Sequence, residues 1–163
     1  MRPSYTVLLI ELYIFSLRDP SGGLVYNTYM KLKFNHVAFT VNDTEESTKW
    51  YVDKLGFVVS NVYSNNGMNI VMLSLNDLVI ELFSFNENTK PLPEYRSTLD
   101  SDLHTVGAKH LCIEVDDLDN FIKDLKGKNV TFASESDTTA FGGKYIFIKD
   151  CNNILIEFLQ KNI

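Results

Sequence analysis

The chain has 163 residues, of which 45% are hydrophobic and 22% are charged, a composition typical of one globular domain with a sizeable core. Its formal net charge of −6 argues against a nucleic-acid-binding protein, which would present a basic surface. The two cysteines are too few for a disulfide framework or a zinc ribbon, and we expect free thiols in a reducing cytoplasm.

The first 29 residues are expected to be an extension ahead of the domain. Residues 5–16 are apolar apart from Glu11, and this stretch is too short to span a bilayer. It also has no clear small-residue cleavage site, which argues against a signal peptide. We therefore expect a cytoplasmic protein with no membrane partner, in which residues 30–163 form a single domain.

A first module is predicted over about residues 34–85. Residues 34–41 alternate as a strand does, with His36 on the face opposite the larger apolar side chains. A helix is expected to begin after Asp43 and to end at Gly56. Three further strands are predicted over residues 57–64, 69–75 and 78–83.

Residues 86–108 are predicted to be a polar connector that acts as a hinge between two modules, because they contain prolines 91 and 93 and no periodic pattern. His104 lies in this connector and is interpreted as a surface loop residue.

A second module, over about residues 109–161, repeats the order of the first. A strand runs from His110 to Val115, and the helix that follows ends at Gly127. Three strands are predicted near residues 130–134, 144–149 and 154–160. Two copies of a β-α-β-β-β order in one chain predict a duplicated α+β fold.

Each module carries one His at the start of its first strand and one Glu within its last. The separation is 81 − 36 = 45 residues for His36 and Glu81, and 157 − 110 = 47 residues for His110 and Glu157. A carboxylate inside such an apolar strand is costly to bury unless a cation compensates it. Any one of the four, taken alone, is more often a structural residue than a ligand, but the recurring spacing favours a metal site.

The expected geometry of this site follows from a pseudo-twofold pairing of the modules, with a first strand beside a last strand. The four side chains would then converge in one concavity of the sheet. Two imidazoles and two carboxylates suit one divalent ion, such as Ni, Zn, Co, Mn or Fe.

These stretches resemble the vicinal oxygen chelate superfamily, which includes glyoxalase I, methylmalonyl-CoA epimerase, extradiol dioxygenases, and fosfomycin- and bleomycin-resistance proteins. The matching stretches are His36-Val-Ala-Phe-Thr-Val, Trp50-Tyr51 with Leu55-Gly56-Phe57, Ile80-Glu81-Leu82, Lys109-His110-Leu-Cys-Ile-Glu-Val-Asp and Ile156-Glu157-Phe158. The resemblance implies two βαβββ modules whose mixed sheets curl into a cup around one metal, with His36, Glu81, His110 and Glu157 as its ligands. It also implies a homodimer, with the cup closed within one chain or by exchange of modules.

The resemblance further implies an enzyme acting on a small molecule. Dioxygenases and fosfomycin-resistance enzymes do not need a carboxylate at the position of Glu81, so this residue favours the isomerase-like branch. There a proton moves beside a carbonyl through a metal-stabilised enediolate, with Glu157 or Glu81 as the base. We expect a glyoxalase I-like lyase or isomerase of a small α-hydroxy or α-keto carbonyl compound, with a thiol hemithioacetal as one candidate. The alternatives are a methylmalonyl-CoA epimerase-like isomerase, a non-enzymatic binding or resistance protein, and an Fe(II) dioxygenase.

Two positions depart from bacterial glyoxalase I and disfavour glutathione as the thiol. Thr40 stands where a glutathione-binding Arg is expected, and Phe85 where an Asn is expected. Strand alternation adds candidates for the substrate cavity, because Thr40, Cys112 and Glu114 share the face of the two histidines and Phe83 shares that of Glu81. Of these, Glu114 is predicted to be solvated.

Overall fold

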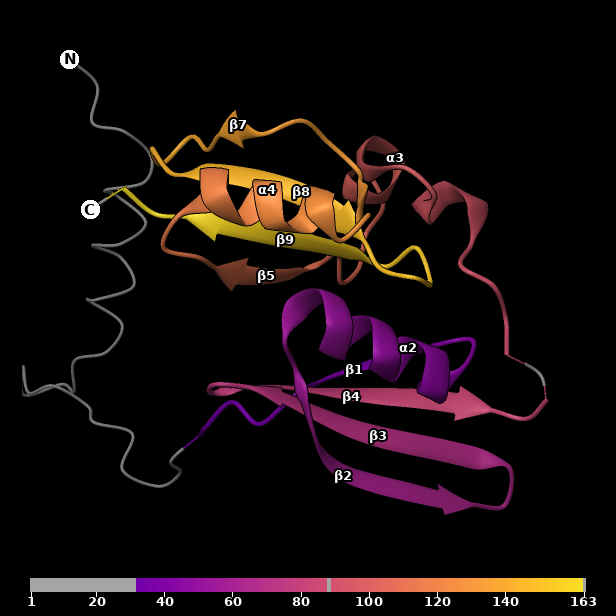
Figure 1. Cartoon of the computed structure of the whole chain (residues 1–163). Coiled ribbons are helices and arrows are strands. Elements are labelled where there is room, and N and C mark those ends of the chain that lie inside the picture. The colour runs from indigo at the N-terminus through magenta and orange to yellow at the C-terminus, as the bar shows by residue number, and fades with distance from the viewer. Residues whose placement is uncertain (1–31, 88, 163) are drawn as a thin grey trace, which may run out of the picture. The chain divides into compact units, whose positions relative to one another are not determined.

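The computed structural model describes residues 32–87 and 89–162, so the interpretation of residues 1–29 as an extension lies outside the described residues. From Asn35 onward the described residues form one compact unit. Figure 1 shows two sheets in this unit, each with one long helix against it. Within the described ranges, no helix is long and apolar enough to cross a membrane.

The first module contains four strands and one helix. Its elements are β1 (Val37–Thr40), α2 (Thr44–Trp50), the π-helical turn η1 (Tyr51–Leu55), β2 (Val58–Asn65), β3 (Met68–Leu75) and β4 (Leu78–Phe85). The strand order is β1-β4-β3-β2, in which β1 runs parallel to β4 and the other neighbours are antiparallel. The predicted order of elements is therefore confirmed.

The helix of this module begins and ends where the sequence predicts. The Asp43 carboxylate accepts a hydrogen bond from the backbone N–H of Glu46 at 2.8 Å, which satisfies one free donor of the first turn. At the other end Gly56 has φ +80°, and the N–H of Phe57 reaches back to the carbonyl of Tyr51 at 3.3 Å. Such a left-handed closing residue is accessible to glycine at little cost.

The second module repeats this topology. Its elements are β5 (Leu111–Glu114), α4 (Leu118–Gly127), β6 (Thr131–Phe132), β7 (Asp137–Thr138), β8 (Lys144–Lys149) and β9 (Leu155–Gln160). The strand order is β5-β9-β8-β6, and β7 pairs with β8. The strand predicted over 130–134 is shortened to the two residues of β6, and β7 lies between the strands predicted over 130–134 and 144–149. The predicted α+β fold of two βαβββ modules is confirmed.

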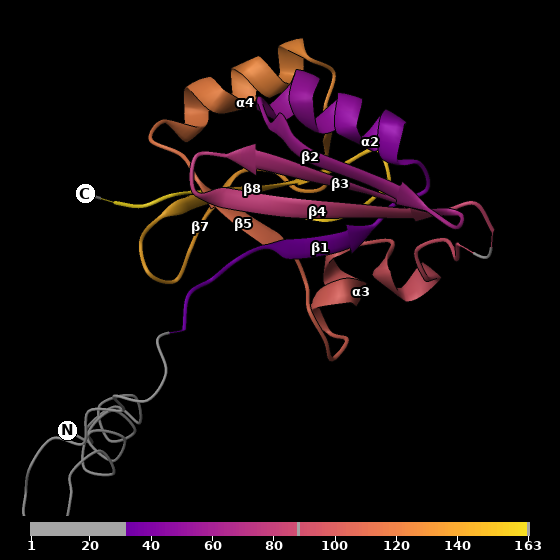
Figure 2. The ribbon, with the colours of Figure 1, turned by 90° about the horizontal axis from the view of Figure 1, so that it is seen from below.

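The connector holds two short helices that the sequence analysis did not predict. They are η2 (Glu94–Arg96) and α3 (Leu99–Leu103), and Thr98 caps the second by accepting a hydrogen bond from the N–H of Ser101. Figure 2 shows this segment beside β1, on the side of the unit away from α2 and α4. His104 follows α3 with an exposed side chain, as predicted for a surface residue.

One hydrophobic core unites the two modules, because the buried side chains of both belong to a single cluster. Its members alternate along the strands and recur at helical spacing on α4, which are the two ways of placing apolar side chains on one face. The fully buried members are Val41, Tyr51, Phe57, Leu73, Ile80, Leu82, Leu118, Leu125, Ile148, Ile156 and Phe158.

Polar contacts across the modules accompany this core. The ammonium of Lys54, in the last turn of the first helix, donates to the carbonyl of Lys128 at 2.7 Å, and the ammonium of Lys128 donates to the carbonyl of Lys54 at 3.1 Å. The hydroxyl of Tyr51 donates to the carboxylate of Asp150 at 3.0 Å. Each lysine thus places a cation at the C-terminal end of the other module's helix, where the helix dipole favours it.

Asp150 gives the fold a predicted dependence on pH. Burial raises the pKa of its carboxyl, although the backbone N–H groups of Ile154 and Asn152 and the hydroxyl of Tyr51 donate to it and lower the pKa in part. A raised pKa in the folded state contributes stability below the ordinary carboxyl pKa of about 4, and this contribution is lost as pH rises through the folded pKa.

We therefore expect Asp150→Asn to change how the free energy of unfolding depends on pH. The free energy of unfolding of the native protein, minus that of the variant, should fall as pH increases from about 3 to 7. Urea titrations at a series of pH values measure this difference. Asp77→Asn, at an exposed turn position, is the control. A difference that rises with pH would contradict the prediction.

Candidate functional site

Both predicted His–Glu pairs are present, one in each module. Nε2 of His36 lies 3.1 Å from a carboxylate oxygen of Glu81, and Nε2 of His110 lies 2.8 Å from a carboxylate oxygen of Glu157. The carboxylates are largely covered, with side-chain exposures of 17% and 16%. A covered carboxylate is costly without a partner, and the imidazole of the same module is the group that lies beside each one.

The same strand register produces both pairs. In the first module Ala38 of β1 is opposite Glu81 of β4, and in the second Cys112 of β5 is opposite Glu157 of β9. Each histidine comes two residues before the residue that lies opposite the glutamate. Because side chains alternate between the two faces of a sheet, the histidine and the glutamate lie on the same face. The spacings of 45 and 47 residues therefore describe one geometry.

The four side chains do not converge within one chain. Among the described residues, no group of three or more His, Cys, Asp or Glu side chains lies close enough to hold a metal ion. The expected arrangement placed a first strand beside a last strand, and β1 does pair with β4 as β5 pairs with β9. Both pairings are within one module, so each histidine meets the glutamate of its own module.

The two pairs differ in what surrounds the histidine. Nδ1 of His36 lies 2.6 Å from the side-chain oxygen of Asn35, whereas Nδ1 of His110 is buried and has no hydrogen-bond partner among the residues that the structure describes. The ring of His110 packs edge-on against Phe147, with 4.8 Å between the ring centres. Phe147 is opposite Glu157 in the sheet, and Met72 holds the equivalent place opposite Glu81.

A hollow of about 300 Å³ adjoins the first pair. Strand register places all of its lining except Val62 on the face that carries Glu81, along β2 and β3. The lining residues are Asn61, Val62, Tyr63, Ile70, Met72 and Glu81. Sequence alternation could have found Ile70 and Met72, whereas Asn61 and Tyr63 required the register between β2 and β3.

The four cavity candidates from the sequence are distributed as follows. Phe83 lies two residues after Glu81 on the same face, and Thr40 is opposite it on β1. Thr40 also lines a separate cavity of about 300 Å³ between β1, the connector and β5. Glu114 is half-exposed and forms an ion pair with Lys161, as expected for a solvated residue.

Cys112 lies beside the second pair, and its surroundings suppress its ionisation. Partial desolvation, the charge of Glu157 and a hydrogen bond to that carboxylate raise the pKa of the exposed Cys112 thiol to about 12. The thiolate is the nucleophilic form of cysteine. Cys112 is therefore unsuited to act as a nucleophile at neutral pH.

Slow alkylation of Cys112 is the expected consequence. The raised pKa keeps the Cys112 thiol protonated at pH 8, so iodoacetamide should label it far more slowly than a free cysteine. Glu157→Gln should accelerate labelling because it removes the neighbouring negative charge. Mass spectrometry of a Cys151→Ser background, which leaves Cys112 as the one remaining cysteine, measures both rates. Labelling as fast as free cysteine would refute the expectation.

Comparison with known proteins decides the family. The model of the Glyoxalase/Bleomycin resistance protein/Dioxygenase superfamily matches residues 33–158. The chain belongs to this superfamily. The mitochondrial methylmalonyl-CoA epimerase of Mus musculus is 32% identical to it over 133 residues, covering 78% of this chain and 72% of the relative. That of Dictyostelium discoideum is 28% identical over 155 residues, covering 90% and 91%.

Solved structures support the superfamily fold. The crystal structure of a glyoxalase family protein from Enterococcus faecalis matches with a TM-score of 0.66 at 22% identity, covering 78% of this chain and 96% of that one. At this identity the likeness bears on the fold alone. The match of the family model to residues 33–158 is what confirms, at the level of the superfamily, the resemblance inferred from the His–Glu stretches.

The donor set of the two pairs fits the divalent ion that superfamily members commonly bind. Ligands about 2.0–2.2 Å from one ion lie about 3 Å apart when they are neighbours around it, which is the separation within each pair. Asn35 beside Nδ1 of His36 leaves Nε2 of that ring with a lone pair for an ion. The assignment of all four residues to a single ion stays a prediction.

Proposed function

We propose that the protein is a metal-dependent epimerase that removes and returns the proton on a carbon beside a thioester carbonyl, as in methylmalonyl-CoA. The observation that carries this proposal is the presence of two equivalent His–Glu pairs in one register. Inversion at carbon requires a base on one face of the substrate and an acid on the other. Glu81 and Glu157 supply two such groups, and the curated relatives named as epimerases support the choice.

The complete site is proposed to lie between two copies of the chain. Within the described residues the two pairs of one copy remain separate. In a twofold-symmetric homodimer, the first pair of one copy can face the second pair of the other, and symmetry then generates two identical sites. His36, Glu81, His110 and Glu157 would hold the ion in each site.

The chain's own residues would have two separate roles, proton transfer and positioning. When bound, the ion supplies positive charge for the carbonyl oxygen as negative charge develops on it. Glu157 and Glu81 would take the proton from one face of the carbon and return it to the other. His110 and His36 hold these carboxylates within 3.1 Å, and Phe147 fixes the ring of His110. The hollow beside Glu81 offers apolar contacts for the acyl group.

Inversion in deuterated water is the direct test. Protein loaded in turn with Co, Ni, Mn and Zn is expected to convert (2S)- into (2R)-methylmalonyl-CoA with one deuterium incorporated, and EDTA should abolish the reaction. Methylglyoxal with glutathione is the comparison substrate for glyoxalase I chemistry. Turnover of that adduct without inversion of the thioester would replace the epimerase by the lyase, and no reaction with any ion would refute both.

A further inference from the structure

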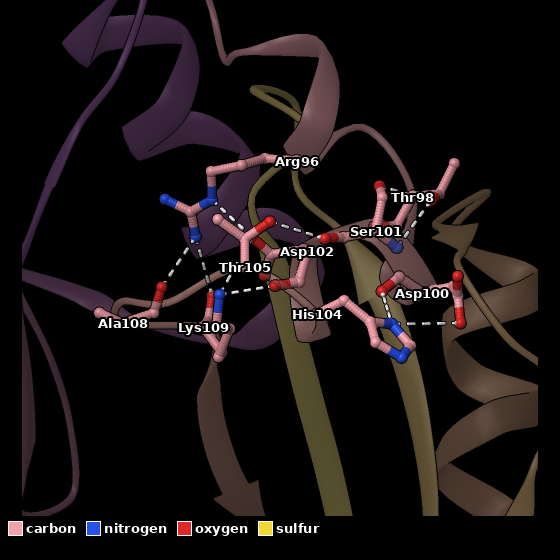
Figure 3. Close-up of polar contacts among 9 residues, drawn as sticks. All are labelled: Arg96, Thr98, Asp100, Ser101, Asp102, His104, Thr105, Ala108 and Lys109. Atoms are coloured by element: carbon pink, nitrogen blue, oxygen red, sulfur yellow. Dashed lines mark hydrogen bonds and ion pairs between the residues drawn. The ribbon is translucent and has the colours of Figure 1, made fainter.

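The connector carries a polar cluster that contacts the backbone beside His110. One terminal nitrogen of Arg96 donates to the carbonyls of Ala108 at 3.1 Å and Lys109 at 3.2 Å. Its Nε donates to the carboxylate of Asp102 at 2.7 Å. Figure 3 shows the guanidinium of Arg96 between these groups. Arg96 thus bonds the two residues that lead directly into His110.

Asp102 holds this arginine in place from a buried position. Its side chain is 1% exposed, and Arg96 is its nearest cation, with the ammonium of Lys109 3.9 Å away. The Lys109 ammonium also donates to the backbone carbonyl of Asp102 at 2.5 Å. The second carboxylate oxygen of Asp102 is buried, with no hydrogen-bond partner in the described part of the chain. A buried carboxylate of this kind makes removal of the arginine costly, so the arrangement is held rigidly.

The connector is therefore attached to the second module rather than free to act as a hinge. Besides the contacts of Arg96 and Lys109, the ammonium of Lys149 at the end of β8 donates to the carbonyl of Ser97 at 2.7 Å. These bonds fix η2 and α3 against the start of β5 and the end of β8.

The duplicated modules provide an internal comparison for what the cluster does. In the first module the ring of His36 is oriented directly, by the Asn35 side chain at Nδ1. In the second, Nδ1 of His110 has no such partner within residues 32–87 and 89–162, and the equivalent preceding residue, Lys109, turns its side chain to the connector instead. The bonds from Arg96 to the carbonyls of Ala108 and Lys109 therefore occur in the module where, among the described residues, Nδ1 of the histidine has no side-chain partner.

We propose that Arg96, held by Asp102, is a positioning residue that fixes the backbone entering β5 and so sets the orientation of His110 towards Glu157. The inference rests on the proposed function in one respect, since it treats His110 as a metal ligand. Residues that orient a ligand typically change metal affinity by about 10- to 100-fold when they are removed.

Two variants test the proposal without leaving the buried carboxylate of Asp102 unpaired. Arg96→Gln with Asp102→Asn removes both charges together. Arg96→Lys keeps the charge of Arg96 but cannot bond Asp102 and two carbonyls at once, because an ammonium lacks the planar fork of a guanidinium. Lys144→Gln, which breaks an exposed ion pair with Asp119, is the control. Thermal unfolding verifies that each variant is folded.

Two measurements are made on the full chain. Calorimetric titration with Co²⁺ is expected to show about 10- to 100-fold weaker binding for both Arg96 variants and unchanged binding for the control. Imidazole ¹H–¹⁵N spectra of metal-free protein are expected to show shifted His110 signals and unchanged His36 signals.

The two measurements separate failure of the positioning role from failure of the proposed function. If the native protein binds no Co²⁺, the proposed function fails, while the spectra of metal-free protein still test the positioning of His110. If His110 signals are unchanged, the positioning role of Arg96 is overturned. Equal shifts of His36 and His110 would overturn it as well, because they would reflect a general change in the fold.

Discussion

Replacing Glu157 by glutamine is expected to lower kcat on the epimerase substrate by about 10²- to 10⁴-fold, the usual contribution of a positioned acid or base. Glutamine keeps the shape of the side chain and its place 2.8 Å from His110, but it cannot accept the substrate proton. Glu81→Gln is expected to have a comparable effect, since the two glutamates are equivalent in register. The measurement is steady-state turnover of metal-loaded protein.

The two variants also separate the roles of the carboxylates. If each serves one face of the carbon, then in deuterated water each variant should retain solvent exchange from one epimer and lose it from the other. Glu114→Gln is the control, because Glu114 lies on β5 near Cys112 and is paired with Lys161 in solvent. Its turnover should stay within about twofold of native. Native turnover by Glu157→Gln would remove its assigned role.

Leu125→Ala is expected to destabilise the whole unit by about 2–5 kcal/mol, including the module that does not contain it. Leu125 is fully buried on α4, in the same cluster as Leu82 of the first module. Because the core is shared, both modules should unfold in one transition. Trp50, the one tryptophan, is in α2 of the first module and reports on that module alone.

Urea unfolding followed by Trp50 fluorescence and by far-UV circular dichroism tests this expectation. Leu125→Ala and Leu82→Ala should each shift both signals together. Leu103→Ala removes the same atoms from a half-exposed position in α3 and should have little effect. If Leu125→Ala left the unfolding transition seen by Trp50 fluorescence unchanged, the modules would unfold independently, as a flexible connector would allow.

The sequence was sufficient for the fold because its signals are local and occur twice. The alternation around Val37 and Val41, the cap at Asp43 and the stop at Gly56 each act within a few residues. Repetition then identified the His–Glu pairs, because two modules with the same strand register need nearly the same number of residues between the His and the Glu. The family resemblance followed from the same stretches.

The arrangement of the site required information that spacing does not contain. The expected convergence of four ligands assumed which strand of one module lies beside which strand of the other, and a pseudo-twofold relation alone leaves this open. The Arg96 cluster was missed because it depends on contacts across 6 to 13 positions in a segment without periodicity. One feature of the sequence did mark Arg96, because it is the sole arginine after position 18.

The reciprocal contact between Lys54 and Lys128 bears on how such a chain arises. The ammonium of each lysine donates a hydrogen bond to the backbone carbonyl of the other. In homodimers this reciprocity defines an isologous interface, in which a surface patch binds its own copy. The two modules therefore meet as two identical subunits would. Fusion of such subunits into one polypeptide leaves the interface intact, and each half is then free to acquire its own way of orienting a histidine.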